Sequence, residues 1–185
     1  MNITSLFNIP AWSKVIPNFD NDMKIKLLDL LREYPEKRNG IQKFYTNRQS
    51  VTSGMIDKFS KIISVELDEL TESLNNYSDK KFDIKVDDVW SASYDEGDYQ
   101  MTHNHSSTGL SGILYVDSPQ DGPSTNLMQP WNDWISDTTK YTSLKFRSGS
   151  MIVLPSFINH SSEPNPSKMR KRIISWDMKI VDRLR

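Results

Sequence analysis

The sequence predicts an α+β protein, mainly β, in which N-terminal helices precede a series of short strands. In the first half of the chain, apolar residues recur at three- and four-residue steps, which is the spacing of a helix that covers a core. From residue 82 onward, short segments alternate between apolar and polar residues and end at turn residues, as strands do. Because no helical segments separate these strands, we expect a sandwich or barrel rather than a parallel sheet.

Composition is typical of one domain without disulfides. The 185 residues are enough for a sizeable core. With 23 Lys and Arg against 24 Asp and Glu, the net charge is −1, so neither nucleic acid nor an anionic membrane is expected as a main partner. The absence of cysteine leaves histidine and carboxylates as possible metal ligands. The chain starts without a secretory signal and contains no run as long as a membrane span, so we expect a cytoplasmic protein.

The first half divides into four segments. Residues 3–15 are interrupted by proline and are expected to form one or two edge strands. Capping residues at 20–22 begin a helix that should end near Tyr34. A polar loop is expected over 36–53, followed by one long helix over 53–77. We interpret the apolar stripe of this helix as the face that covers the sheet, rather than as a partner-binding face.

The second half is expected to supply most of the strands. They are predicted at 82–86, 89–94, 110–116, 144–146, 151–154 and 172–180. Between 118 and 143 the glycines, prolines and polar residues predict a long loop. The sequence leaves the oligomeric state open.

All three histidines of the chain lie near the ends of predicted strands. His103 and His105 are two residues apart, so on a strand they would point to the same face and could bind one ion. His160 closes the apolar run 151–160 and would add a third imidazole from a neighbouring strand. Such a site suits iron, zinc, copper, nickel or manganese. The alternative is a pair of surface histidines with His160 as a turn residue.

Several ordered segments of the second half carry a resemblance to a known family. They are Trp90, 94–105, 110–117, 154–160 and 173–177. Together they resemble the iron(II)- and 2-oxoglutarate-dependent oxygenases, and in particular a branch related to prolyl 4-hydroxylases that is found in bacteria and their phages. The resemblance implies a double-stranded β-helix, or jelly roll, over 82–182, with helical support from 18–80, in a single domain of residues 1–185.

The resemblance also assigns roles to the histidines. It implies that His103 and His160 are the first and last iron ligands. Most of the superfamily has aspartate or glutamate at the middle ligand position, whereas this chain has His105, as is usual in the resembling branch. A neutral ligand at this position leaves iron(II) with more net positive charge.

A binding site for the co-substrate is implied by the same resemblance. Tyr115 corresponds to the tyrosine that binds the distal carboxylate of 2-oxoglutarate, and a buried carboxylate also needs a cation. Two residues could supply this cation. Counting back from residues 175–177 of the final strand gives Lys171, whereas keeping the family's Arg-Ile pair together gives Arg172. Alternation along a strand lets only one of them face inward, and the sequence leaves both open. Asp117 and Asp177 are further candidates for positioning the metal ligands.

The implied activity is that of a dioxygenase that uses iron(II), O2 and 2-oxoglutarate. The co-substrate would be oxidised to succinate and CO2 while a C–H bond is hydroxylated, and by analogy the substrate would be a prolyl or other residue of a peptide or protein. Two alternatives remain. One is a cupin-like enzyme that uses the same histidines without 2-oxoglutarate, and the other is a non-catalytic jelly-roll binding module or phage structural protein.

Overall fold

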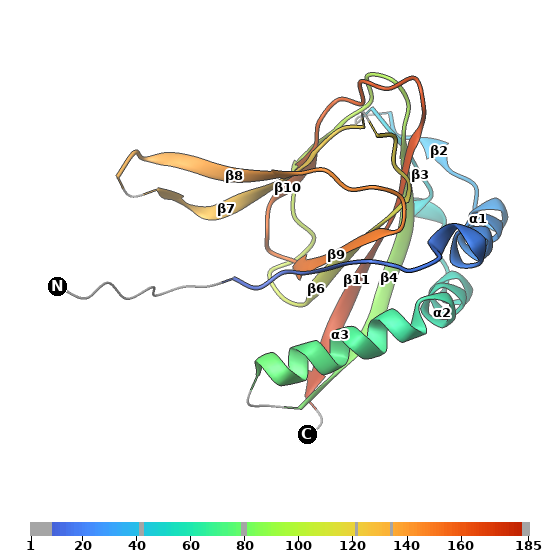
Figure 1. Cartoon of the computed structure of the whole chain (residues 1–185), viewed down its shortest axis with the longest axis horizontal. Helices are drawn as coiled ribbons and strands as arrows, with labels where there is room; N and C mark the ends of the chain where they lie inside the picture. The colour runs from blue at the N-terminus through green and yellow to red at the C-terminus, as the bar shows by residue number, and fades with distance from the viewer. Residues whose placement is uncertain (1–8, 41–42, 79–80, 121, 134, 183–185) are drawn as a thin grey trace.

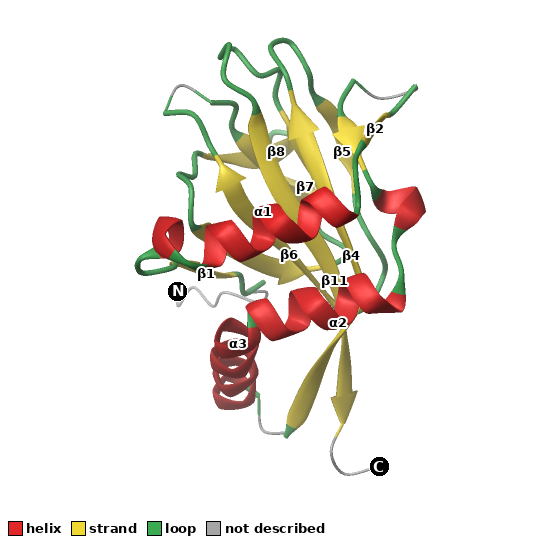
Figure 2. Ribbon diagram, turned by 90° about the vertical axis from the view of Figure 1, so that its right-hand side faces the viewer, coloured by secondary structure: helices red, strands yellow, loops and turns green. Residues whose placement is uncertain are grey.

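The protein contains two antiparallel sheets, and its helices lie on the outer face of the larger sheet (Figure 1, Figure 2). This computed structural model describes residues 9–40, 43–78, 81–120, 122–133 and 135–182. The larger sheet has the order β1 (Trp12–Val15), β9 (Ser150–Pro155), β6 (Leu110–Asp117), β11 (Lys171–Asp182), β4 (Phe82–Tyr94), β3 (Tyr45–Thr46) and β2 (Lys37–Arg38). The smaller sheet has the order β5 (Gln100–His103), β10 (His160–Ser162), β7 (Thr125–Asp133) and β8 (Thr138–Leu144). The mainly β, double-stranded β-helix class expected from the sequence is confirmed.

The helices cover the larger sheet. They are α1 (Met23–Glu33), α2 (Ser53–Ile62) and α3 (Ser64–Tyr77), with single 3-10 turns η1 (Phe19–Asn21) and η2 (Arg48–Ser50). The hydroxyl of Thr52 accepts a hydrogen bond from the backbone N–H of Met55 at 3.3 Å, which caps the start of α2. None of the helices in these ranges is long and apolar enough to cross a membrane.

The expectation of one long helix over 53–77 is wrong. At Ile63 the backbone leaves helical geometry, with φ −102° and ψ 22°, and α2 and α3 run in different directions (Figure 2). The side chain of Ile63 is fully buried at this corner. Phe59 of α2 and Leu70 of α3 both lie in the core between the helices and the larger sheet.

Two apolar layers stabilise the fold, one between the helices and the larger sheet and one between the two sheets. Trp176 of β11 is fully buried in the first layer, with its ring 5.3 Å from that of Phe59. A Cβ atom at Gly112 of β6 would lie 2.1 Å from the Trp176 indole, so this strand pairing requires glycine there. Tyr115 and Ile173 belong to the second layer, which forms the floor of the site described below.

Two predicted loops contain strands. β7 and β8 pair in a hairpin that projects from the body of the protein, although all of their residues except Leu144 were expected within a long loop (Figure 1). Most of its side chains are exposed on both faces, so its sequence lacks the apolar alternation that marks a half-buried strand. Residues 36–53 contain β2, β3 and η2, and β3 extends the larger sheet beside β4.

Candidate metal centre

The three histidines converge at one end of the smaller sheet. His103 ends β5 and His160 begins β10, and the two residues are paired directly across the sheet. His105 lies two residues beyond β5, in the loop that leads to β6, and not on the strand as expected. Its backbone N–H donates a hydrogen bond to the carbonyl of Ser156 at 3.0 Å, which fixes this loop against the end of β9.

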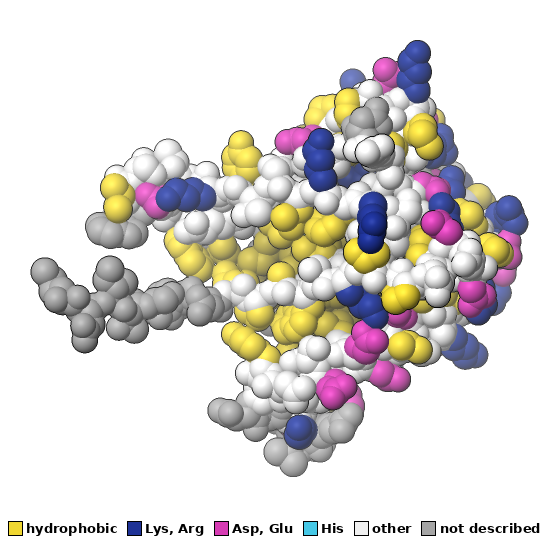
Figure 3. Space-filling model, viewed as in Figure 1, with side chains coloured by type: hydrophobic (Ala, Val, Ile, Leu, Met, Phe, Trp, Pro, Cys, Tyr) yellow, Lys and Arg dark blue, Asp and Glu magenta, His cyan; other side chains and the backbone are white. Residues whose placement is uncertain are grey.

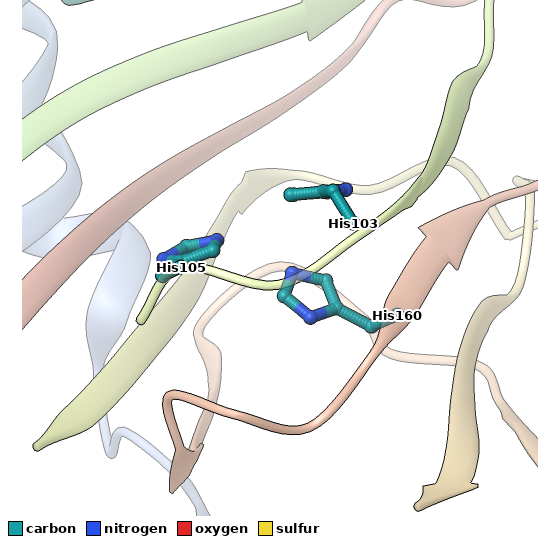
Figure 4. A group of neighbouring side chains, drawn as sticks. All are labelled: His103, His105 and His160. Atoms are coloured by element: carbon teal, nitrogen blue, oxygen red, sulfur yellow. The ribbon is translucent and has the colours of Figure 1, made fainter. Parts of the chain in front are cut away.

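The imidazole rings face a common space (Figure 4). Ring centroids are separated by 4.4 Å for His103 and His160, 5.0 Å for His105 and His160, and 5.4 Å for His103 and His105. One ring nitrogen from each residue lies within 4.8 Å of the others, so a single ion could be bound by all three.

Hydrogen bonds orient His103 and His160 in the same way. Nδ1 of His103 lies 2.9 Å from the carbonyl of Met101, and Nδ1 of His160 lies 3.0 Å from the carbonyl of Ile158. A carbonyl can only accept, so each Nδ1 carries the proton and each Nε2 keeps its lone pair for a metal. Burial lowers the pKa of His103, and it lowers that of His160 to about 3, with a further contribution from the neighbouring His103. Both rings are therefore neutral near pH 7, as metal ligands must be.

His105 is oriented by a carboxylate. Its Nδ1 lies 2.6 Å from Oδ1 of Asp177, and the hydroxyl of Ser111 donates to the same oxygen at 2.7 Å. Burial alone would raise the pKa of Asp177, but the hydrogen bonds from His105 and Ser111 outweigh it and hold this pKa below its usual range. The ring of His105 also packs on Trp90, with centroids 5.1 Å apart.

Lys171 lines the same pocket as the three histidines. Its side chain is 1% exposed, and Nζ donates a hydrogen bond to the hydroxyl of Ser162 at 3.1 Å. Burial lowers the pKa of Lys171 to about 8. Arg172, its neighbour in sequence, points to the helix-covered face, where Nη1 lies 3.3 Å from Asp117. The structure therefore places Lys171, and not Arg172, beside the histidines.

Two buried tyrosines flank the lysine. The ring centroids of Tyr94 and Tyr115 lie 5.3 and 5.4 Å from Nζ of Lys171. The hydroxyl of Tyr115 lies 2.7 Å from that of Thr125, and burial raises the tyrosine pKa, so the hydroxyl stays protonated. The hydroxyl of Tyr94 donates to Oε1 of Gln100 at 2.6 Å.

Sequence reasoning missed five polar residues that line this pocket, namely Gln100, Thr125, Ser161, Ser162 and Ser175. Ser162 could have been found, because it lies two residues after His160 on the same strand and so faces the same way. Of the two aspartates proposed to position ligands, Asp177 does contact His105. Asp117 instead lies 3.0 Å from Lys24, on the helix side of the sheet.

A family model described as "Putative 2OG-Fe(II) oxygenase" matches residues 88–177. This match places residues 88–177 in the iron(II)- and 2-oxoglutarate-dependent oxygenase superfamily. The matched segment contains all three histidines, Tyr115 and Lys171. The match supports a 2-oxoglutarate-dependent dioxygenase with iron as its metal cofactor. No curated protein matches the chain in sequence.

Several solved structures share the fold. A prolyl-4-hydroxylase of Pseudomonas putida has a TM-score of 0.61 at 13% identity, covering 91% of this chain and 92% of its own. The viral collagen prolyl hydroxylase of Paramecium bursaria Chlorella virus 1 has a TM-score of 0.56 at 17% identity, covering 90% and 94%. The epimerase SnoN, in complex with Fe3+, alpha ketoglutarate and nogalamycin RO, has a TM-score of 0.64 at 13% identity, covering 94% and 79%.

The described residues of this oxygenase fit both the metal and the co-substrate. Imidazoles suit iron(II), and each Nδ1 is hydrogen-bonded to an oxygen, which leaves the Nε2 atoms to face the metal. Nε2 of His103 lies 3.2 Å from Nε2 of Gln100, a contact that a bound metal would replace. Lys171 is a buried ammonium in the same pocket, as the carboxylate of a dicarboxylic co-substrate requires.

Proposed function

We propose that this oxygenase binds iron(II) through His103, His105 and His160, binds 2-oxoglutarate through Lys171, and hydroxylates a prolyl or other residue of a peptide. One observation carries the proposal: three imidazoles whose ring nitrogens lie within reach of one ion share a pocket with a buried lysine. Three protein ligands leave positions open on the metal for a chelating co-substrate and for O2. Bound iron and 2-oxoglutarate would supply the oxidising chemistry, in which a C–H bond is hydroxylated and succinate and CO2 are released.

Lys171 is suited to hold the distal carboxylate of the co-substrate. An ammonium group has three N–H donors, and the described residues accept one hydrogen bond from it, through Ser162. A buried ammonium group with unused N–H donors costs free energy. A carboxylate that binds to it would therefore stabilise both groups. The hydroxyl pair of Tyr115 and Thr125 lies on the same side of the pocket and would supply a further donor. Arg172 is not part of this proposal, because it faces the helices.

A groove beside the metal centre suits an apolar peptide segment. It has a volume of 560 Å³ and lies between the β7–β8 hairpin, residues 9–11 and the end of β9. Figure 3 shows apolar side chains lining the hollow between the hairpin and the first described residues. Ile158, whose carbonyl anchors His160, is part of the groove, as is Leu127, which pairs with His160. The groove therefore lies beside the strand that carries His160, although none of the three histidines lines it.

An anaerobic titration with iron(II) and 2-oxoglutarate tests the proposal. We expect a weak visible charge-transfer band that requires both additions. Iron uptake without the band would favour a cupin-like enzyme, and no metal uptake would favour a binding module. Peptides that differ only in carrying proline or alanine then test the substrate, with succinate release and the mass gain of one oxygen atom as readouts. Oxygen incorporation into a non-peptide substrate alone would contradict the peptide assignment.

A further inference from the structure

The three proposed ligands differ in what accepts their Nδ1 protons. For His103 and His160 the acceptor is a neutral backbone carbonyl. For His105 it is the carboxylate of Asp177, at the shorter distance of 2.6 Å. The three imidazoles bring no negative charge to a metal. The carboxylate of Asp177 is the negative group that is hydrogen-bonded to one of them.

We propose that Asp177 is a positioning residue that gives the metal centre its negative charge through His105. This inference rests on the proposed metal site and concerns a residue one hydrogen bond away from it. A carboxylate that accepts the Nδ1 proton fixes the ring and makes the opposite nitrogen a stronger donor to the metal. Replacing such a partner typically weakens metal binding about 10- to 100-fold.

The structure holds the carboxylate in place for this role. Asp177 is paired with Ser111 across β11 and β6, and the hydroxyl of Ser111 donates to the oxygen that faces His105. The hydroxyls of Ser111 and Ser156 lie 2.8 Å apart, and the carbonyl of Ser156 accepts from the backbone of His105. The register of β11 against β4 shifts directly after Asp177, as at a β-bulge, which commonly re-aims a side chain.

Within the described ranges, no lysine or arginine forms an ion pair with Asp177. The guanidinium of Arg48 is close by, but it lies over the ring of Trp90 at 4.1 Å and pairs with Asp88 at 3.9 Å. The charge on Asp177 is therefore directed to His105. The side chain of Asp177 is 23% exposed, so solvent screens this charge only in part.

Asp88 provides a matched control for a charge-removing substitution. It lies on β4 directly opposite Asp177 of β11, and its side chain is 34% exposed. Its described partners are the backbone N–H of Val89 and the Arg48 side chain, so it contacts none of the histidines. Asp88→Asn and Asp177→Asn thus remove the same charge from neighbouring positions, but only the second changes the partner of His105.

The test measures anaerobic iron(II) affinity of the full chain by titration calorimetry and the reduction potential of the bound iron. We expect Asp177→Asn to weaken iron(II) binding about 10- to 100-fold, and Asp88→Asn to change it less than about threefold. The potential should rise in Asp177→Asn above that in Asp88→Asn, because a nearby anion favours iron(III) over iron(II). Thermal unfolding of the metal-free variants checks that both fold.

Two outcomes would overturn the inference in different ways. If wild-type protein binds iron and the two variants lose affinity equally, or neither loses any, Asp177 has no special role and the proposed metal site stands. If wild-type protein takes up no iron, the proposed metal site fails and the role of Asp177 fails with it.

Discussion

Lys171 and Arg172 are neighbours on β11, yet their side chains lie on opposite faces of the larger sheet. Lys171 enters the histidine pocket and bonds to Ser162, whereas Arg172 pairs with Asp117 beneath the helices. A carboxylate in the pocket can therefore be reached by the first cation and not by the second. This separation makes the pair a test of where 2-oxoglutarate binds.

Lys171→Ala should weaken 2-oxoglutarate binding, and Arg172→Ala should leave it nearly unchanged. Loss of a hydrogen-bonded charge partner costs about 2 kcal/mol or more, which is a factor of about 30. The dissociation constant is measured under anaerobic conditions from the visible band formed with iron(II). Equal losses in the two variants would place the co-substrate elsewhere.

Binding of 2-oxoglutarate should weaken as the pH rises above about 8. Burial lowers the pKa of Lys171 to about 8, so the ammonium that a carboxylate needs is present below this pH and lost above it. With one proton involved, affinity should fall by up to about tenfold per pH unit over roughly pH 8 to 10. The comparison is Lys171→Arg, whose guanidinium stays charged across this range, so any affinity that it retains should not fall. A parallel fall in both proteins would show that another group is responsible.

The fold and much of the site could be predicted because strand alternation is visible where one face is buried. Lys171, Ile173, Ser175 and Asp177 lie on the inner face of β11, and Arg172, Ile174 and Trp176 lie on its outer face, so each face carries both polar and apolar residues. Alternation shows that Lys171 and Arg172 lie on opposite faces, but only the tertiary structure shows which face meets the histidines.

Other features depend on tertiary contacts that leave little trace in sequence. The β7–β8 hairpin is exposed on both faces, so its sequence lacks apolar alternation and predicts a loop. The break at Ile63 is not marked in the sequence, because the apolar stripe runs through it without interruption. His105 lies off the strand because its backbone bonds to Ser156, a partner 51 residues later in the chain.

The metal-free protein should lose stability as the pH falls from about 6.5. His160 is buried and neutral, and its pKa is lowered to about 3, whereas in the unfolded chain it would be near 6.5. Between these values the unfolded state binds more protons, so unfolding becomes easier as the pH falls, by at most about 1.4 kcal/mol per pH unit for this group. Urea unfolding at several pH values measures the slope. His160→Gln should reduce it, and an unchanged slope would assign the proton uptake to other residues.

Gly112→Ala should destabilise the fold by about 1 to 3 kcal/mol. A Cβ at this position would lie 2.1 Å from the indole of Trp176, which is fully buried and cannot move without disturbing the layer under the helices. Gly40→Ala is the control, because a Cβ there meets nothing within 4 Å. Urea unfolding of both variants gives the comparison. Equal stability of the two would mean that Trp176 repacks at little cost.

Trp131→Ala should impair use of a peptide substrate without affecting the co-substrate. Trp131 lines the groove beside the metal centre together with Tyr141 of the facing strand, and the two side chains are 45% and 63% exposed. Exposed aromatic side chains at a groove commonly dominate binding, so KM for the peptide should rise about tenfold or more. Ile135→Ala is the control, because Ile135 is 78% exposed near the hairpin tip and lies outside the groove. Succinate formed without peptide should be the same in both variants. A rise in KM shared by Ile135→Ala would show a general effect of the hairpin, and no rise in either would place the peptide on another surface.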